Sequence, residues 1–403
     1  MRPHTIATAL LLGFSGAAHA VTYSISSIQV TDLGTNGGHA SAAYGINDHG
    51  DIVGWADDSN DKQRPMIFRN GAMSFVDAGV VPYVFGAAYD INNSRIVVGQ
   101  YVVLGGPIQN YAFRWSPGST MVALETDVAP GLGLWWETYA SAINNGGRVA
   151  GMAARAPGSP NPPDTGQLCY DNLPVVWAST AAGSYPMKLF CIQDFDQDEN
   201  MDLEGTFPWA QDINESGNTV GTDAMSTPYS MFLVRNGLRT MVPPPAGVNK
   251  FDANNVPLYG RADGISDQNW VVGSFRYYGG GVPASGRRAF FWDTLTPESQ
   301  NLGVLSGGTW SAASAINESK MVVGTSQRKI INIWLRDAGF IWHPNFGMKA
   351  LPAPPYSGLV QGDCYAWAVN ELDAMGVVQI AGGCEVSGQL HAVRWDVHIT
   401  TSP

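Results

Sequence analysis

A short segment recurs seven times along this chain, and this repeat constrains the fold more than any other feature. Six copies place a glycine eight positions after an anchor isoleucine, with asparagine following the isoleucine in five of them. The anchors are Ile46, Ile91, Ile143, Ile213, Ile265 and Ile316, and a looser seventh copy begins at Val369. Successive anchors lie 45, 52, 70, 52, 51 and 53 residues apart. Such regular spacing indicates one structural unit used seven times, and the 70-residue interval marks an insertion.

Each unit is expected to form four short strands. In the first unit these strands cover residues 41–46, 52–55, 67–68 and 73–76, and turn-forming sequences separate them. The apolar residues alternate with a period near two, and 47 glycines and 25 prolines argue against helices. Four antiparallel strands in a repeat of roughly 40–50 residues are typical of a β-propeller blade. The sequence therefore predicts an all-β, seven-bladed β-propeller that occupies residues 21–403 as a single domain.

The two ends of the chain are expected to close the ring together. The seventh unit has a third strand at 391–395 and little sequence after it, whereas Tyr23–Leu33 precedes the first unit and has the character of a fourth strand. We predict that this N-terminal strand completes the seventh blade, because a closed ring leaves no open sheet stack to aggregate.

Two of the repeat copies point to a known family. Residues 37–47 align without a gap to residues 307–317, and Asp32-Leu33-Gly34 precedes the first of them. With the Val-Val-Gly and Ala-Phe-Trp patterns in other units, the chain resembles the HAF-repeat extracellular protein family over essentially all of its length after residue 20. The resemblance implies an exported bacterial repeat protein and assigns little function. The chain departs from the pattern at Ser266, which replaces the asparagine, and in the stretched seventh unit.

Residues 1–20 have the three-part pattern of a secretory signal, with an apolar run at 6–14 and small residues at Ala18 and Ala20. The apolar run is too short to span a bilayer, and no later stretch reaches the roughly 18 apolar residues that this needs. We therefore expect a secreted or periplasmic protein without a membrane anchor. A formal net charge of −12 disfavours nucleic acid as a partner.

The repeat map divides the ring into two faces and pairs the cysteines. We call the end where each first strand begins the top, so the turns after the anchor residues lie at the bottom. All four cysteines fall near the top, and their positions on neighbouring strands predict the disulfides Cys169–Cys191 and Cys364–Cys384. Each closes a loop of about 20 residues, which stabilises the fold by roughly 3 kcal/mol.

An acidic segment inside the 70-residue interval is the strongest candidate for a metal site. The oxygen-bearing residues at alternating positions are Asp194, Asp196, Asp198, Asn200 and Asp202. This pattern suits calcium, which takes six or more oxygen ligands, and it resembles the calcium loops of FG-GAP and integrin propeller repeats. It departs from an EF-hand because Glu199 and Gly205 stand where that loop has glycine and glutamate. The alternative is a solvated acidic loop.

Large aromatic residues precede several first strands and are candidates for ligand binding. Counting six positions back from the anchor gives Phe85, Phe207, Tyr259 and Trp310, and Trp135 and Trp136 lie close to the equivalent place. They are expected near the top mouth of the ring, where they could stack on a sugar ring or another flat ligand. The alternative is that they pack between blades.

Recognised catalytic motifs are absent from the sequence after residue 20. Its five histidines are scattered, and neither a nucleophile elbow nor a phosphate-binding loop occurs. We therefore expect a non-catalytic binding or scaffold protein, stabilised by calcium, whose partner is a glycan, another polymer or an envelope protein. The alternatives are a hydrolase or lyase that acts on an extracellular polysaccharide or polymer, with acidic residues at the channel mouth, and a structural envelope protein.

Overall fold

The structure is a computed structural model, and it covers most of the repeat region. The residues described are 21–79, 83–103, 109–124, 135–155, 172–181, 184, 186–189, 209–222, 231–246, 260–276, 286–330, 334–355 and 362–402. They form 28 strands and no helix. Accordingly, no described segment is a helix long and apolar enough to cross a membrane.

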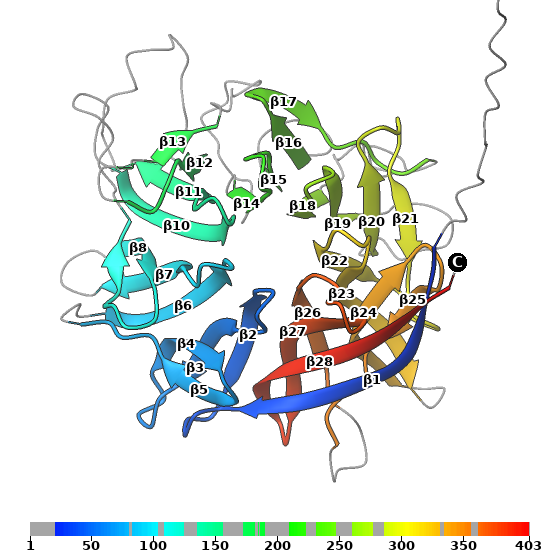
Figure 1. Cartoon of the computed structure of the whole chain (residues 1–403), viewed down its shortest axis with the longest axis horizontal. Helices are drawn as coiled ribbons and strands as arrows, with labels where there is room; N and C mark the ends of the chain where they lie inside the picture. Colours follow the sequence, from blue (N-terminus) through cyan, green and yellow to red (C-terminus); the bar gives the residue numbers. More distant parts are fainter. Residues whose placement is uncertain are drawn as a thin grey trace, which may run out of the picture.

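The strands form seven antiparallel sheets of four strands each, arranged around one axis (Figure 1). The predicted seven-bladed β-propeller is therefore confirmed. Blades 1 to 6 follow the chain, from β2-β3-β4-β5 to β22-β23-β24-β25, and blade 7 is β26-β27-β28-β1. The first strand of every blade contacts the first strands of both neighbouring blades, so these seven strands form a closed inner ring.

The inner strands are β2 (Ser41–Ile46), β6 (Tyr83–Ile91), β10 (Trp135–Ile143), β14 (Trp209–Ile213), β18 (Gly260–Ile265), β22 (Ser311–Ile316) and β26 (Cys364–Val369). The second strands are β3 (Ile52–Asp57), β7 (Val97–Val103), β11 (Val149–Arg155), β15 (Thr219–Thr222), β19 (Trp270–Arg276), β23 (Val322–Ile330) and β27 (Val377–Val386). The third strands are β4 (Gln63–Arg69), β8 (Gln109–Trp115), β12 (Asn172–Trp177), β16 (Met231–Arg235), β20 (Arg287–Asp293), β24 (Trp334–His343) and β28 (Gln389–Ser402). The outer strands are β5 (Ala72–Phe75), β9 (Val122–Ala123), β13 (Pro186–Lys188), β17 (Leu238–Met241), β21 (Gln300–Gly303), β25 (Gly347–Ala350) and β1 (Thr22–Gly34).

Blade 7 is assembled from both ends of the described chain. Strand β1 pairs antiparallel with β28, in a register that runs from Thr22 opposite Ser402 to Gly34 opposite Ala392. Figure 1 shows these two long strands side by side, in blue and red, on the outside of the ring. The predicted closure by the N-terminal strand is confirmed.

The repeated glycine is explained by a β-bulge in every inner strand. The bulged residue lies two positions before the anchor, as Tyr44 does between Ala43 and Gly45. The bulge brings the inner strand so close to the second strand that a Cβ on Gly54 would lie 1.9 Å from the carbonyl oxygen of Ala42. The equivalent distances in the other six blades are 1.8 to 2.1 Å, so no side chain fits there.

The seventh copy keeps the same contact in a longer hairpin. Its glycine is Gly382, where a Cβ would lie 2.0 Å from the carbonyl oxygen of Tyr365. Gly382 stands thirteen positions after Val369 rather than eight. An additional turn between β26 and β27, in which Gly376 donates its N–H to the carbonyl oxygen of Asp373, accounts for the difference.

Apolar side chains fill the space between neighbouring blades. Between blades 1 and 2, Val53 and Ile67 pack with Ala88 and Ile91 in a cluster that also contains the fully buried Phe113. Burying one such large side chain contributes about 1.5–3 kcal/mol relative to leaving it exposed. Because every blade needs its neighbours to bury these faces, the blades stabilise one another.

Two rings of hydrogen bonds join the blades at the bottom. In the first ring, the side-chain amide after the anchor donates to the equivalent carbonyl of the next blade, as Asn92 Nδ2 does to Asn144 O at 3.1 Å. Six blades make this bond, and blade 5 lacks it because Ser266 carries no amide. In the second ring, each following residue donates its backbone N–H to the side-chain oxygen of its counterpart in the next blade. This second ring is closed and joins Asp48, Asn93, Asn145, Glu215, Asp267, Glu318 and Glu371.

Candidate functional site on the inner strands

The structure describes only part of the site predicted from the sequence. Phe85, in the first half of β6, is 42% exposed, and Trp310 is partly buried just before β22. Trp135 and Trp136 begin β10. The remaining aromatic candidates Phe207 and Tyr259 lie outside the described residues. The same is true of the predicted calcium ligands Asp194, Asp196, Asp198, Asn200 and Asp202.

One of the two predicted disulfides lies within the described residues. Cys364 and Cys384 are directly opposite each other on β26 and β27, and they form a disulfide. This confirms the pairing predicted for the top of blade 7. Cys169 and Cys191 lie outside the described residues, so their pairing stays a prediction.

The inner strands bring together a different set of aromatic residues. The bulge, two positions before the anchor, carries Tyr44 in blade 1, Tyr89 in blade 2 and Trp367 in blade 7. Two residues earlier, at the fourth position before the anchor, further aromatic side chains occur in blades 3, 4 and 7. We call these six residues the aromatic arc: Tyr44, Tyr89, Tyr139, Trp209, Tyr365 and Trp367.

Contacts between rings join the arc across blade boundaries. Tyr365 stacks on Trp367 with ring centroids 5.7 Å apart, and Trp367 meets Tyr44 edge-on at 5.1 Å. Tyr44 then stacks on Tyr89 at 5.7 Å. Farther round, Tyr139 and Trp209 lie 5.1 Å apart. The arc therefore extends over blades 7, 1, 2, 3 and 4, and all six side chains are partly exposed.

The hydroxyl groups of the arc stay protonated at physiological pH. Burial raises the pKa of Tyr44, Tyr89 and Tyr139 above the ordinary tyrosine value, and burial also raises the pKa of Tyr365 to about 12. Some of the polar groups are already engaged, since Trp55 Nε1 donates to the Tyr44 hydroxyl at 3.0 Å and Trp209 Nε1 donates to Ser141 Oγ. The arc can therefore offer neutral hydrogen-bonding groups beside its apolar ring faces.

Blade 5 interrupts the aromatic character with a charged pair. Arg261 and Asp263 occupy the same two inner positions that carry Tyr365 and Trp367 in blade 7. The Arg261 Nη2 atom lies 3.0 Å from Asp263 Oδ1, and the arginine side chain is half exposed. Burial raises the pKa of Asp263, although Arg261 and Arg287 oppose this shift. The inner wall is thus aromatic on five blades and charged on blade 5.

Two carboxyl groups of the inner strands could be candidates for acid–base chemistry. Burial raises the pKa of Asp90 to about 7 and that of Asp212 to about 6. In both groups, however, one carboxyl oxygen accepts the backbone N–H of the anchor that follows it, and the other oxygen accepts the N–H of an anchor in the next blade. The second bonds come from Ile143 and Ile265, at 2.8 and 2.9 Å. Both carboxyl groups therefore join neighbouring blades through these hydrogen bonds.

The aromatic arc is visible in the sequence, but at a different distance from the anchor than the one used for the prediction. Counting six positions back from the anchor selects Phe85 and Trp310, whose rings do not stack on another described ring. Counting two or four positions back selects every residue of the arc. The bulge explains the difference, because it directs the residue two before the anchor toward the same position of the neighbouring blades.

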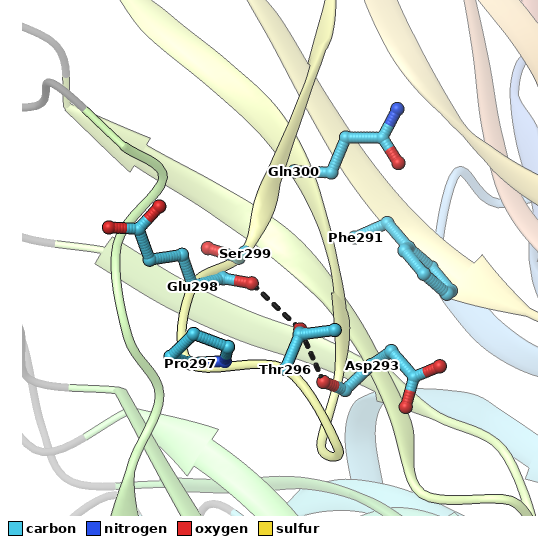
Figure 2. Close-up of a pocket in the computed structure, with 7 residues that line it drawn as sticks. All are labelled: Phe291, Asp293, Thr296, Pro297, Glu298, Ser299 and Gln300. Atoms are coloured by element: carbon cyan, nitrogen blue, oxygen red, sulfur yellow. Dashed lines mark hydrogen bonds between the residues drawn. The ribbon is translucent and has the colours of Figure 1, made fainter.

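A separate shallow pocket of about 350 Å³ is formed by the hairpin of β20 and β21 in blade 5 (Figure 2). Its lining consists of Phe291, Asp293, Thr296, Pro297, Glu298, Ser299 and Gln300. The Thr296 hydroxyl donates to the backbone oxygens of Asp293 and Glu298, and in Figure 2 the Glu298 carboxylate points away from the Phe291 ring. The residues of one hairpin line this pocket, whereas the aromatic arc contains residues of five blades.

The comparisons with known proteins find only distant structural neighbours. No protein-family model and no curated protein sequence matches the chain. Among solved structures, a gluconolactonase from Xanthomonas campestris is 9% identical, with a TM-score of 0.33 over 93% of this chain and 91% of that one. Trypanosoma rangeli sialidase is 11% identical, with a TM-score of 0.35 over 92% of this chain and 59% of its own. An Aleuria aurantia lectin is 9% identical, with a TM-score of 0.31 over 91% and 96% of the two chains.

Proposed function

We propose that this protein binds a glycan chain, with sugar rings held against the aromatic arc of the inner strands. The observation that carries the proposal is that Tyr365, Trp367, Tyr44 and Tyr89 form one continuous series of ring contacts across three blades. Aromatic rings provide large, rigid faces for the apolar faces of a ligand, and their polar atoms orient it.

Exposure separates this interpretation from simple packing between blades. The aromatic residues that fill the blade interfaces are fully buried, as Phe113, Trp177 and Phe340 are on the third strands. The arc residues instead keep part of their surface open. The Tyr89 and Tyr365 hydroxyls and the Trp367 indole N–H form no hydrogen bond with a described residue. These groups are available to a ligand.

A matched pair of variants tests the proposal. Tyr44 stacks on Tyr89 at 5.7 Å and Tyr101 stacks on Tyr111 at 5.5 Å, both at an interplanar angle of 26°, but only the first pair belongs to the arc. A panel of soluble neutral and acidic polysaccharides should include one that the protein retains. Tyr44→Ala should then weaken its binding at least about tenfold, as expected for an aromatic anchor, while Tyr111→Ala leaves it unchanged.

Two results would contradict glycan binding at the arc. One is that no polysaccharide of the panel is retained, and the other is that Tyr111→Ala weakens binding as much as Tyr44→Ala does. Cleavage of a retained polysaccharide would instead favour the hydrolase or lyase.

The proposal includes export and stabilisation by calcium, both of which rest on the sequence. Residues 1–20 predict secretion, and the acidic segment from Asp194 to Asp202 predicts a calcium site. Calcium should raise the melting temperature relative to a chelator, and Asp196→Ala should remove the difference. An identical melting temperature with calcium and with chelator would remove the metal from the proposal.

A further inference from the structure

Five arginines lie at the top of the interface between blades 5 and 6. They are Arg261, Arg276, Arg287, Arg328 and Arg336, and we call them the arginine cluster. The chain has only 22 basic residues against 34 acidic ones, so this is a local reversal of its overall charge. Such a reversal does not serve general solubility and needs a separate explanation.

The strand register places four of these side chains in the interface. Ala289 of blade 5 and Ala338 of blade 6 belong to the same apolar cluster between these blades. Because side chains alternate along a strand, Arg287 and Arg336, each two residues earlier, lie on the same two faces. Arg276 is directly opposite Arg287, and Arg328 is directly opposite Arg336. The arginines therefore continue the blade 5–6 interface above its apolar part.

The fifth member links this interface to the inner strands. Arg261 is opposite Ser274, which lies two residues before Arg276 and so shares its face. Arg261 also occupies the inner position that Trp209 occupies in the neighbouring blade 4. The arginine cluster thus begins where the aromatic arc ends.

Two members of the cluster, Arg276 and Arg287, have no carboxylate within ion-pair distance among the described residues. Within the described part of blade 5, Asp263 pairs with Arg261 rather than with either of these two arginines. Desolvation lowers the pKa of Arg287, and the nearby Arg261 and Arg276 lower it further, while Asp263 opposes them. Arginines directly opposite each other on paired strands repel, so a bound anion would stabilise this arrangement.

Among the described residues, Asp263 is the carboxyl group whose charge acts on Arg287. The Arg336 Nε atom is buried and hydrogen-bonds to no described residue. Asp337 follows in sequence but lies on the other face of β24, where its N–H donates to Asp363 of blade 7. The segments that connect the cluster's strands, 277–285 and 331–333, contain no Asp or Glu.

We propose that the arginine cluster binds the acidic groups of an anionic glycan whose sugar rings lie on the aromatic arc. This inference rests on the proposed function and specifies its ligand class. Guanidinium groups bind carboxylate and sulfate oxygens through two parallel hydrogen bonds, which suits either a uronic acid or a sulfate ester. The acidic groups supply counter-charge to Arg276 and Arg287, and the arc holds the uncharged part of the chain.

Pairs of polymers with and without charge test this inference. Polygalacturonate should bind about tenfold more tightly than its methyl ester, and salt should weaken only the charged polymer. Dextran sulfate compared with dextran gives the same test for sulfate, so the two pairs distinguish carboxylate from sulfate recognition. The double variant Arg276→Gln/Arg287→Gln should abolish the preference for the charged polymer and leave binding of the methyl ester unchanged.

The control variant removes two positive charges from a surface outside the arginine cluster. Arg235 and Arg239 are exposed on the outer hairpin of blade 4, and their double substitution by glutamine should keep the preference. Equal binding of charged and uncharged polymers, or an equal loss in the control variant, would overturn the arginine cluster as the anion site. Tyr44→Ala separates the two proposals, because it should weaken both polymers of a pair. If it weakens neither, glycan binding at the arc fails, and with it this inference.

Discussion

The two ends of the seven inner strands are built on opposite principles. At the bottom, nearly every blade repeats the same asparagine and the same hydrogen bonds to its neighbour, and blade 5 differs only through Ser266. At the top, equivalent positions carry tyrosine, tryptophan, arginine or alanine, depending on the blade. The repeated end determines the ring, and the varied end is where specific recognition can be placed.

This comparison predicts that substitutions at the bottom change the stability of the fold without changing ligand binding. It also predicts that the stability of the top depends on links present in single blades. The largest effect on stability is expected at the top of blade 7, where a disulfide is present. Replacing Cys364 and Cys384 by serine opens a cross-link of sequence separation 20, and this should lower the free energy of unfolding by about 3 kcal/mol. Urea unfolding measures the change. An unchanged unfolding midpoint would contradict this prediction, because strand pairing alone would then stabilise the top of blade 7.

A smaller loss is expected when one link of the bottom ring is removed. Asn144 is buried, its amide donates to Asn214 O at 2.9 Å, and its oxygen accepts the N–H of Arg148 at 2.8 Å. Asn144→Ala should therefore cost about 2 kcal/mol, since it leaves buried groups unpaired. Thermal or urea unfolding measures this cost. The exposed Asn145→Ala is the control and should cost much less, and equal costs would contradict the role assigned to the buried ring.

The carboxylates of the second bottom ring should make stability depend on pH. Burial raises the pKa of Glu371 to about 7, and the neighbouring Glu318 and Asp48 add to this shift. The folded protein then keeps a proton that the unfolded chain has already lost. Raising the pH from about 4.5 to about 7 should therefore lower stability, by about 1 to 2 kcal/mol for this residue.

Glu371→Gln should remove this part of the pH dependence and make the protein more stable than the wild type at pH 8. Unfolding in urea at pH 5 and pH 8 measures both effects. Glu215→Gln, at an exposed position of the same ring, is the control and should leave the pH dependence unchanged. A Glu371→Gln variant whose stability follows the wild-type pH profile would contradict the prediction.

The smallest expected effect is a gain in stability when blade 5 receives the side-chain amide that it lacks. Ser266 Oγ already accepts the N–H of Trp270, and blade 5 donates no side-chain amide to Asn317. Ser266→Asn should supply that amide and raise stability by about 1 kcal/mol, the net contribution of one hydrogen bond. The melting temperature measures the gain. A loss would show that the turn of blade 5 cannot accommodate asparagine.

The same contrast explains what could be predicted from the sequence. Seven blades, the closing N-terminal strand and the Cys364–Cys384 disulfide were predictable, because each follows from counting between repeated residues. The bulge at Tyr44 was not, since no residue type marks it, and it changes which positions face the neighbouring blades. The arc and the arginine cluster depend on register across strands and on contacts between blades, and the repeat copies do not share these residues.

Crystallography of the protein with a bound acidic oligosaccharide tests the central claim most directly. The predicted result is electron density for sugar rings against Tyr44 and Trp367, with an acidic group at Arg287. Density for the same oligosaccharide only at the bottom ring, or only on the outer strands, would contradict the claim that the aromatic arc of the inner strands is the binding site.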